Sequence, residues 1–377
     1  MTDLDHILPL WQELRASGTP YVLATVVEVE GSGYRKPGAR MMIASDGRRA
    51  GTISGGCLEG EVARKAFWHT SDGPTLRHYS TSPEDGEVPF GMGCGGVVRV
   101  LLERPETAEP MLERLAAHYA ERTPVSAATV LDRDGIGERA FWPPTGAETS
   151  DGPTALQALA RQGYEEQSSF SCAVALAGHE SDGRESVPIR VEWNAPRPGL
   201  FVFGAGDDAI PMVRLARQMG WYVSVADGRS NLATQARFPE AHEVHVLAAG
   251  ALPSFNPRPT DAAVVLTHSL EQDTRILAAL LDEDLAYIGV LGPQRRTAEI
   301  LATLAEKSGL HSSRSEAQVH AWMERLHAPM GLDLGGDTPA DVAISVIAEI
   351  QQSRHRRTGL PLRQVRVRAV ELKRASA

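Results

Sequence analysis

The sequence predicts an α/β protein in which a parallel-sheet domain follows an N-terminal α+β domain. From Leu200 onward, short apolar segments alternate with segments of helical periodicity, which is typical of a parallel sheet covered by helices on both faces. In the N-terminal part, extended segments adjoin hairpin turns such as Ser45-Asp46-Gly47. The pattern changes after Asn194–Gly199, where two prolines predict a linker.

The length of 377 residues suffices for two or three domains. We expect an N-terminal α+β domain over 1–123, a strand-rich middle segment and linker over 124–196, a Rossmann-like domain over 197–353 and a basic tail over 354–377. We expect the tail to be a solvated segment; docking to a partner is the alternative.

Composition narrows the class of protein. The net charge of −10 does not favour nucleic acid or anionic lipid as a partner. Three cysteines, an odd and sparse set, do not form a disulfide framework and point to the cytoplasm. No apolar run approaches the roughly 20 residues that span a bilayer.

Periodicity and turn residues predict the elements in chain order. In the first domain we expect a helix over 4–16, strands over 21–30, 40–44 and 48–53, a helix over 58–68, a long loop over 70–96, a strand over 97–102 and a helix over 109–121. The middle segment should contain strands over 126–131, 139–142, 172–176 and 188–193. The last domain should contain strands over 200–203, 222–226, 243–247, 263–267 and 287–291, with helices between and after them.

The clearest motif is Gly204-Ala205-Gly206-Asp207-Asp208-Ala209, which follows a strand and opens a helix. In a dinucleotide-binding turn, Gly204 would permit the tight turn and Gly206 the approach of a phosphate. Asp227 ends the second strand, where a carboxylate could bind ribose, and Arg229 follows it. Asp207 and Asp208, expected in the first helical turn, would repel a pyrophosphate, so a Rossmann-shaped domain without a nucleotide is the alternative.

A second constellation lies in the N-terminal glycine loops, Gly31–Ala39 and Gly51–Glu59. Exposed amides and the positive charge of Arg35 could cradle a phosphate. Cys57 should begin a helix, whose dipole favours the thiolate, and Cys94 lies among four glycines. Both cysteines could instead be small buried residues.

The remaining residues give weaker signals. Cys172 lies in an apolar strand and should be structural. His268 ends a predicted strand, where ligand crevices form, although a structural histidine is the simpler interpretation. The twelve histidines form no recognised metal motif, and no residue is assigned a catalytic role.

Taken together and in this order, the motifs resemble the XdhC/CoxI family. The N-terminal similarity runs through Gly31-Ser32, Arg35, Pro37-Gly38-Ala39, Gly51–Glu59 and Gly93-Cys94-Gly95-Gly96. The C-terminal similarity runs through Phe203–Gly206, Asp227, Arg229, Arg237-Phe238-Pro239, Thr267-His268, Asp273, Gly289–Gly292, Arg295, Arg296, Gly331-Leu332-Asp333 and Thr338-Pro339. Together these cover residues 5–105 and 197–352. The family often has His at the position of Asp207.

The resemblance implies an accessory factor that binds molybdenum cofactor, assists its sulfuration with a cysteine desulfurase and delivers it to an apo molybdenum hydroxylase of the xanthine dehydrogenase type. Cys57 and Cys94 would be the candidate metal or sulfur contacts. The full set of candidate cofactor-binding residues is Ser32, Arg35, Gly55, Gly56, Cys57, Glu59, Cys94, Gly95, Gly204, Gly206, Asp227, Arg229 and His268. We also expect a homo-oligomer.

Two other functions remain open. An NAD(P)-dependent oxidoreductase would use the Gly204–Ala209 turn, Asp227 and His268, with NAD(P) or another nucleotide as its cofactor. A scaffold that bridges the desulfurase and the target enzyme would need neither Cys57 nor Cys94. The resemblance favours a cofactor chaperone without turnover of its own.

Overall fold

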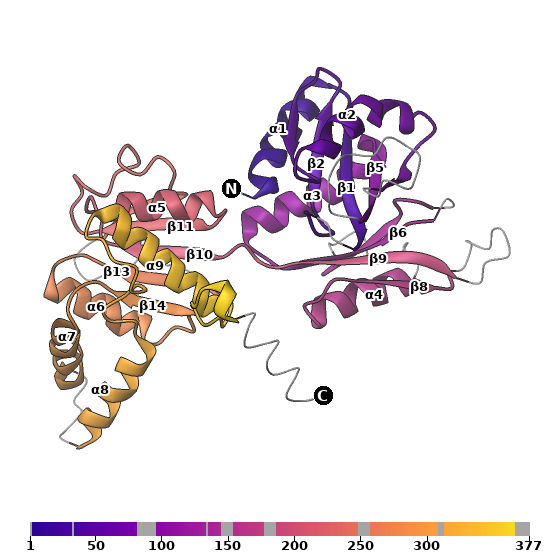
Figure 1. Cartoon of the computed structure of the whole chain (residues 1–377). Coiled ribbons are helices and arrows are strands. Elements are labelled where there is room, and N and C mark those ends of the chain that lie inside the picture. The colour runs from indigo at the N-terminus through magenta and orange to yellow at the C-terminus, as the bar shows by residue number, and fades with distance from the viewer. Residues whose placement is uncertain are drawn as a thin grey trace. The chain divides into compact units, whose positions relative to one another are not determined.

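A computed structural model describes residues 2–31, 34–80, 96–132, 135–144, 154–176, 186–247, 257–307 and 313–365, apart from the side chains of Cys57, Thr154 and 313–315. The chain divides into two compact units, Met1–Arg197 and Pro198–Ala377. Figure 1 shows the elements of each unit. Within the described ranges, the helices lack the length or the apolar character that crossing a membrane requires.

The N-terminal unit starts with a five-stranded antiparallel sheet in the order β3-β2-β1-β5-β4. Its elements are α1 (Asp3–Ser17), β1 (Tyr21–Glu30), β2 (Arg40–Ala44), β3 (Arg49–Gly51), α2 (Cys57–His69), β4 (Thr75–Ser80), β5 (Val97–Glu103) and α3 (Pro105–Glu121). Alternate side chains of β1 face opposite sides of the sheet. Val22 and Val26 pack with α2, whereas Tyr21 and Leu23 pack with α1 and α3.

Two predictions in this region are wrong in part. The loop predicted over 70–96 contains β4, an edge strand that pairs with β5. Its sequence has little apolar character, so it gives a weak strand signal. Residues 81–95 of the same predicted loop lie outside the described residues. Helix α3 begins at Pro105 rather than at 109, since proline suits the first turn of a helix, where its missing N–H costs nothing.

A second antiparallel sheet, in the order β7-β6-β9-β8, completes the unit. Its elements are β6 (Val125–Val130), β7 (Arg139–Trp142), α4 (Thr154–Glu165), β8 (Phe170–Val174) and β9 (Val187–Asn194). The four predicted strands are confirmed, but α4, which packs on this sheet, was not predicted. Cys172 is half-buried on β8 and packs against the same core, in line with a structural role.

Two buried ion pairs connect the two sheets. Arg40 on β2 donates to both carboxylate oxygens of Glu192 on β9, at 2.9 and 2.8 Å. Arg139 on β7 donates to Glu103 on β5 at 2.7 Å, and both of these side chains are at most 5% exposed. Burial raises the pKa of Glu103 despite the nearby guanidinium of Arg139. These pairs tie the antiparallel sheets into one unit.

The C-terminal unit is a five-stranded parallel sheet in the order β12-β11-β10-β13-β14, which confirms the predicted Rossmann-like domain. Its elements are β10 (Gly199–Phe203), α5 (Ala209–Gln218), β11 (Tyr222–Asp227), β12 (Glu243–Val246), β13 (Ala262–Val265), α6 (Leu270–Leu280), β14 (Tyr287–Val290), α7 (Gln294–Lys307), α8 (Ser313–Arg325) and α9 (Pro339–Arg354). The described residues of the basic tail, 355–365, are exposed.

Helices cover both faces of the parallel sheet (Figure 1). Leu200 and Val202 of β10 pack on the side of α5 and α9, and Phe201 and Phe203 pack on the side of α6 and α7. The strand order reverses between β10 and β13. The loops that follow these two strands therefore meet at the topological switch point, the usual ligand crevice of such sheets.

Candidate functional site

The turn before α2 carries the described part of the N-terminal motif. Gly56 occupies the N-cap position of α2 with φ of +117°, a conformation that a side chain would strain. Cys57 is the first residue of the helix, so its predicted position at a helix N-terminus is confirmed. Gly55 and Gly56 are exposed. The backbone at this helix start is therefore accessible to a ligand.

Glu59 anchors this turn through hydrogen bonds with its backbone and with Ser54. Its Oε1 accepts hydrogen bonds from the amides of Ser54, at 2.7 Å, and Ile53, at 3.2 Å, while its Oε2 accepts from the Ser54 hydroxyl at 2.5 Å. The Ser54 hydroxyl also accepts from the amides of Gly56 and Leu58, both at 3.3 Å. Glu59 thus faces protein donors and positions the glycine turn.

The ionisation of Glu59 matches this role. Burial acts to raise its pKa, but hydrogen bonds from the Ser54 hydroxyl and from the backbone amides outweigh burial and hold that pKa below its usual range. The charged carboxylate is therefore the form that the turn stabilises. Sequence patterns did not indicate the role of Ser54; the only signal was a serine shortly before an acidic residue in the first helical turn.

Arg35 lies in the glycine loop that leads to β2, and its guanidinium pairs with Asp3 of α1. About a third of its side chain is exposed, so binding a phosphate would require exchange of this partner. The same loop is fixed further on, where Arg40 donates to the carbonyl of Gly38 at 3.0 Å. Asp3 was not among the predicted site residues.

The structure brings only part of the predicted N-terminal site together. Gly55, Gly56, Cys57 and Glu59 share one turn, but the side chain of Cys57 is not described. Ser32, Cys94 and Gly95 lie outside the described residues. Among the residues that are described, no group of three or more His, Cys, Asp or Glu side chains could hold a metal ion.

In the C-terminal unit, the turn after β10 has the geometry that its glycines predict. Gly204 has φ of +127°, and a Cβ at this position would lie 2.5 Å from the carbonyl oxygen of Leu266. Its amide donates to Ala226 at 2.8 Å. Helix α5 begins only at Ala209, so the prediction that Asp207 and Asp208 lie in its first turn is wrong. They form the bend before it.

Asp227 is fully buried and saturated with hydrogen bonds. Its Oδ2 accepts from the amide of Ala205 and from Arg229 Nη2, each at 2.7 Å, and its Oδ1 accepts from Arg229 N and Nε. Burial acts to raise the pKa of Asp227, but the hydrogen bonds from Arg229 and Ala205 outweigh it and lower that pKa. A ribose hydroxyl would have to displace these donors.

Asp208 fills the space where a phosphate would approach Gly206. Its Oδ1 lies 2.5 Å from the position that a Cβ on Gly206 would take. This oxygen is buried and has no hydrogen-bond partner in the described part of the chain. In a dinucleotide turn, that space serves the pyrophosphate. The sequence indicated repulsion by Asp208 but not this physical occupation.

His268 projects at the end of β13, next to Asp208. Its Nε2 lies 3.4 Å from Asp208 Oδ2, and 64% of its side chain is exposed. Its φ of +60° is unusual for a residue other than glycine, and such strain clusters at functional sites. The neighbouring Thr267 fixes the loop by donating to the fully buried Asp273 at 2.5 Å. Asp273 also pairs with Arg296.

We expect the wild-type protein to bind NADH and NADPH with dissociation constants weaker than about 1 mM. The reason is that Asp208 places both volume and negative charge at the phosphate position. Asp208→Ala should tighten the binding, as measured by nicotinamide fluorescence. Asp207→Ala is the matched control, since its side chain is 87% exposed and pairs with Arg237. Micromolar binding by the wild type would contradict this interpretation.

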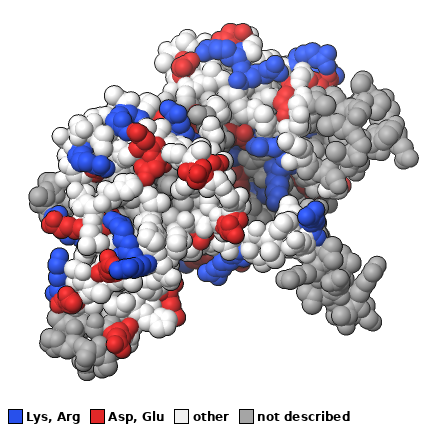
Figure 2. Space-filling model, turned by 60° about the vertical axis from the view of Figure 1, so that its left-hand side comes forward, with Lys and Arg blue, Asp and Glu red and all other residues white. Residues whose placement is uncertain are grey.

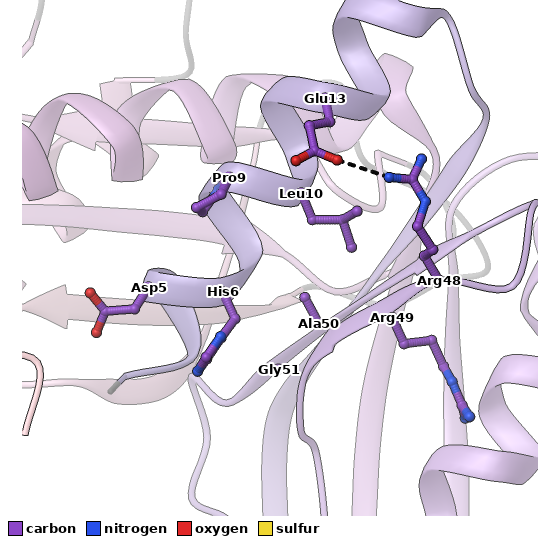
Figure 3. A pocket seen from close by; sticks show the side chains of 9 residues that line it. All are labelled: Asp5, His6, Pro9, Leu10, Glu13, Arg48, Arg49, Ala50 and Gly51. Atoms are coloured by element: carbon purple, nitrogen blue, oxygen red, sulfur yellow. Dashed lines mark hydrogen bonds and ion pairs between the residues drawn. The ribbon is translucent and has the colours of Figure 1, made fainter. Parts of the chain in front are cut away.

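A separate hollow of about 710 Å³ lies between α1 and β3 (Figure 3). Leu10 and Ala50 are among its lining residues, and Glu13 reaches Arg48 at 2.9 Å. Its lining carries both signs of charge. On the face shown in Figure 2, the described Lys and Arg side chains are likewise interspersed with Asp and Glu.

Comparison with known proteins covers both units. Residues 200–350 match the family model described as the XdhC Rossmann domain, and residues 14–80 match that of the XdhC and CoxI family. A protein of Bacillus subtilis (strain 168), named as a probable subunit of xanthine dehydrogenase, is 31% identical over 345 residues, covering 89% of this chain and 93% of that protein. The chain belongs to the XdhC and CoxI family. The resemblance that the motifs indicated is confirmed.

Two further proteins are similar to the present chain over nearly its whole length. The molybdenum cofactor insertion chaperone PaoD of Escherichia coli (strain K12) is 26% identical over 366 residues, covering 94% of this chain and 90% of PaoD. A crystal structure described as a xanthine dehydrogenase from Bacillus halodurans is 28% identical, with a TM-score of 0.70, and covers 95% of this chain and 97% of that one. The fold is thus shared along nearly the whole chain.

Proposed function

We propose that this XdhC/CoxI protein binds molybdenum cofactor as cargo, assists its sulfuration and delivers it to an apo molybdenum hydroxylase of the xanthine dehydrogenase type. A cysteine desulfurase would be the sulfur-supplying partner, and the protein would act in the cytoplasm as a homo-oligomer. Membership of the family and similarity to PaoD along 90% of its length support this function.

The observation that carries the proposal is the Gly55-Gly56-Cys57 turn at the start of α2. Its two glycines are exposed, and hydrogen bonds from Ser54 and Ile53 to Glu59 hold the turn in place. A helix N-terminus favours anions, both the phosphate of the cofactor and the thiolate form of a cysteine. Backbone amides and a thiolate together fit a cargo that carries a phosphate, soft sulfur atoms and a metal.

In this proposal the residues have distinct roles. Cys57 and Cys94 contact the metal or its sulfur as thiolates, which are the softest ligands available to a protein. The amide of Gly55 holds the anionic end, and the amide of Gly56 joins it once it leaves the Ser54 hydroxyl. Ser32, Gly95 and Arg35 are further contacts once Arg35 leaves Asp3. Docking of the target enzyme would release the cargo. No residue is given a catalytic role.

The C-terminal unit contributes a second candidate contact surface through Gly204, Gly206, Asp227, Arg229 and His268. The geometry of Asp208 disfavours a pyrophosphate there. We therefore place the phosphate of the cargo at the N-terminal turn and do not favour an NAD(P)-dependent oxidoreductase. His268 is the most exposed polar candidate at that crevice.

Measurement of bound pterin tests this function. The protein is co-expressed with active molybdenum-cofactor biosynthesis and purified without oxygen, and the oxidised fluorescent pterin is quantified per monomer. Wild type should carry pterin. Cys57→Ser and Cys94→Ser should each carry at least about tenfold less pterin per monomer, because the loss of one contact worth about 1.4 kcal/mol weakens binding by that factor.

Cys172→Ser is the matched control for the loss of a thiol. Cys172 lies half-buried on β8, and burial raises the pKa of its thiol, which disfavours the thiolate. This variant should retain the pterin content of the wild type. A folded wild type without pterin, under conditions that load PaoD, would reject the proposal. Full activation of the target enzyme by both Cys57→Ser and Cys94→Ser would instead favour a scaffold that bridges desulfurase and target.

A further inference from the structure

Tyr34 is the most exposed large hydrophobic side chain among the described residues, with 79% of it accessible. Exposure of an aromatic ring to this extent forfeits the stabilisation that burial would provide. It lies in the glycine loop that leads to β2, directly before Arg35. Most of this side chain is therefore accessible to a ligand.

The ring of Tyr34 lies against Gly55. A Cβ added to Gly55 would lie 3.5 Å from Cγ of the ring and 3.7 Å from both Cδ atoms, which places it over the ring near Cγ. These are ordinary van der Waals distances, so the ring packs next to this glycine. The ring is thus placed on the turn at the start of α2.

That turn is a fixed support. Ser54 and Ile53 donate to the buried carboxylate of Glu59, which anchors the chain on the N-terminal side of Gly55. On its C-terminal side, the amide of Gly56 donates to the Ser54 hydroxyl at 3.3 Å. A ring that rests on a fixed turn is preorganised, so that a ligand would lose less entropy on stacking against it.

We infer that Tyr34 is a stacking platform for the planar ring system of the pterin, with the anionic end of the cargo at the start of α2. This assignment rests on the proposed function and adds a residue to it. Aromatic side chains bind planar heterocycles by offset stacking over their faces. Arg35 is the next residue in the chain, and the exposed Gly55 lies against the ring. Once Arg35 leaves Asp3, both suit the charged part of the same ligand.

The test compares Tyr34→Ala and Tyr34→Phe with Trp68→Ala. Trp68 is the matched control, because it is 71% exposed and lies in the last turn of the same helix, about 16 Å from Cys57 along the axis. Each variant is purified without oxygen after loading, and its pterin content and rate of pterin loss on dilution are measured. Neither readout depends on the activity of a target enzyme.

Tyr34→Ala should bind the pterin roughly 5- to 150-fold more weakly, the range measured when stacking on an aromatic ring is removed. Tyr34→Phe and Trp68→Ala should match the wild type, and thermal unfolding should be unchanged since both side chains are exposed. Wild-type retention by Tyr34→Ala, or equal loss in Trp68→Ala, overturns the platform while the proposed function stands. A wild type without pterin overturns both.

Discussion

Replacing Arg40 by methionine should lower the free energy of unfolding by about 3–5 kcal/mol, because it strands a buried carboxylate. Arg40 and Glu192 are 4% and 11% exposed, and the guanidinium contacts both carboxylate oxygens. Burial acts to raise the pKa of Glu192, but the charge and hydrogen bonds of Arg40 outweigh it and hold that pKa below its usual range. Urea denaturation of wild type and variant measures the difference.

The double variant Arg40→Met with Glu192→Met is the control. It removes both charges, and such replacements of a buried pair are often neutral or stabilising. A double variant as unstable as Arg40→Met alone would show that packing, rather than the stranded charge, explains the loss. Loss of the hydrogen bond from Arg40 to Gly38 should also loosen the glycine loop that contains Tyr34 and Arg35.

The pH dependence gives an independent check of the same pair. In the wild type the pKa of Glu192 is lowered by folding, so its contribution is present above the unfolded pKa and is lost as the pH falls through the folded value. In Arg40→Met, Glu192 loses its main partner and keeps only Arg190 and Asn194 against its burial, so its pKa in the folded state should rise relative to the wild type. The deficit of the variant relative to wild type should therefore grow as the pH rises. A deficit that is constant with pH would contradict this account.

Glu59→Ala should cost about 2–5 kcal/mol of unfolding free energy, since it leaves two buried amides and a hydroxyl without their acceptor. These are the amides of Ile53 and Ser54 and the Ser54 hydroxyl. Their faster hydrogen exchange would locate the effect at the turn. Because folding lowers the pKa of Glu59, its contribution is present above the unfolded pKa and is lost as the pH falls through the folded value.

Glu61→Ala is the matched control in the same helix. Glu61 pairs with Lys65 at 2.7 Å and with Arg64, pairs of the kind that contribute about 1 kcal/mol or less at a surface. This variant should keep both the stability and the pterin content of the wild type. Glu59→Ala should lose pterin even at temperatures where it remains folded. Retention of pterin by folded Glu59→Ala would separate the turn from cargo binding.

Periodicity predicted the parallel sheet well because β10, β13 and β14 are short apolar runs buried on both faces. It failed for α4, where Gly163 in the last turns lowers the local helix propensity. A Cβ at Gly163 would lie 2.5 Å from a methyl of Val191, so this glycine serves close packing of the helix on the sheet. Single-sequence patterns record propensity and miss such contacts between distant segments.

The local position of some candidate residues could be predicted from the sequence, but their contacts could not. Cys57 at the start of a helix follows from local sequence, since a glycine pair and a polar first turn mark such a boundary. The positioning by Glu59, the pairing of Arg35 with Asp3 and the occupation of the space over Gly206 by Asp208 depend on side-chain conformation and long-range folding. No residue spacing encodes these contacts.

In the bend after β10, the backbone amides find their hydrogen-bond partners within the protein itself. Asp227 and Ala226 take up the amides of Ala205 and Gly204, and a carboxylate of the same bend fills the remaining space. A ligand stabilises a fold appreciably only when its concentration approaches or exceeds its dissociation constant from the folded state. The melting temperature of the C-terminal unit should therefore be independent of nucleotide supply, and a cell that is starved or rich in nucleotides would hold the same folded fraction of this domain.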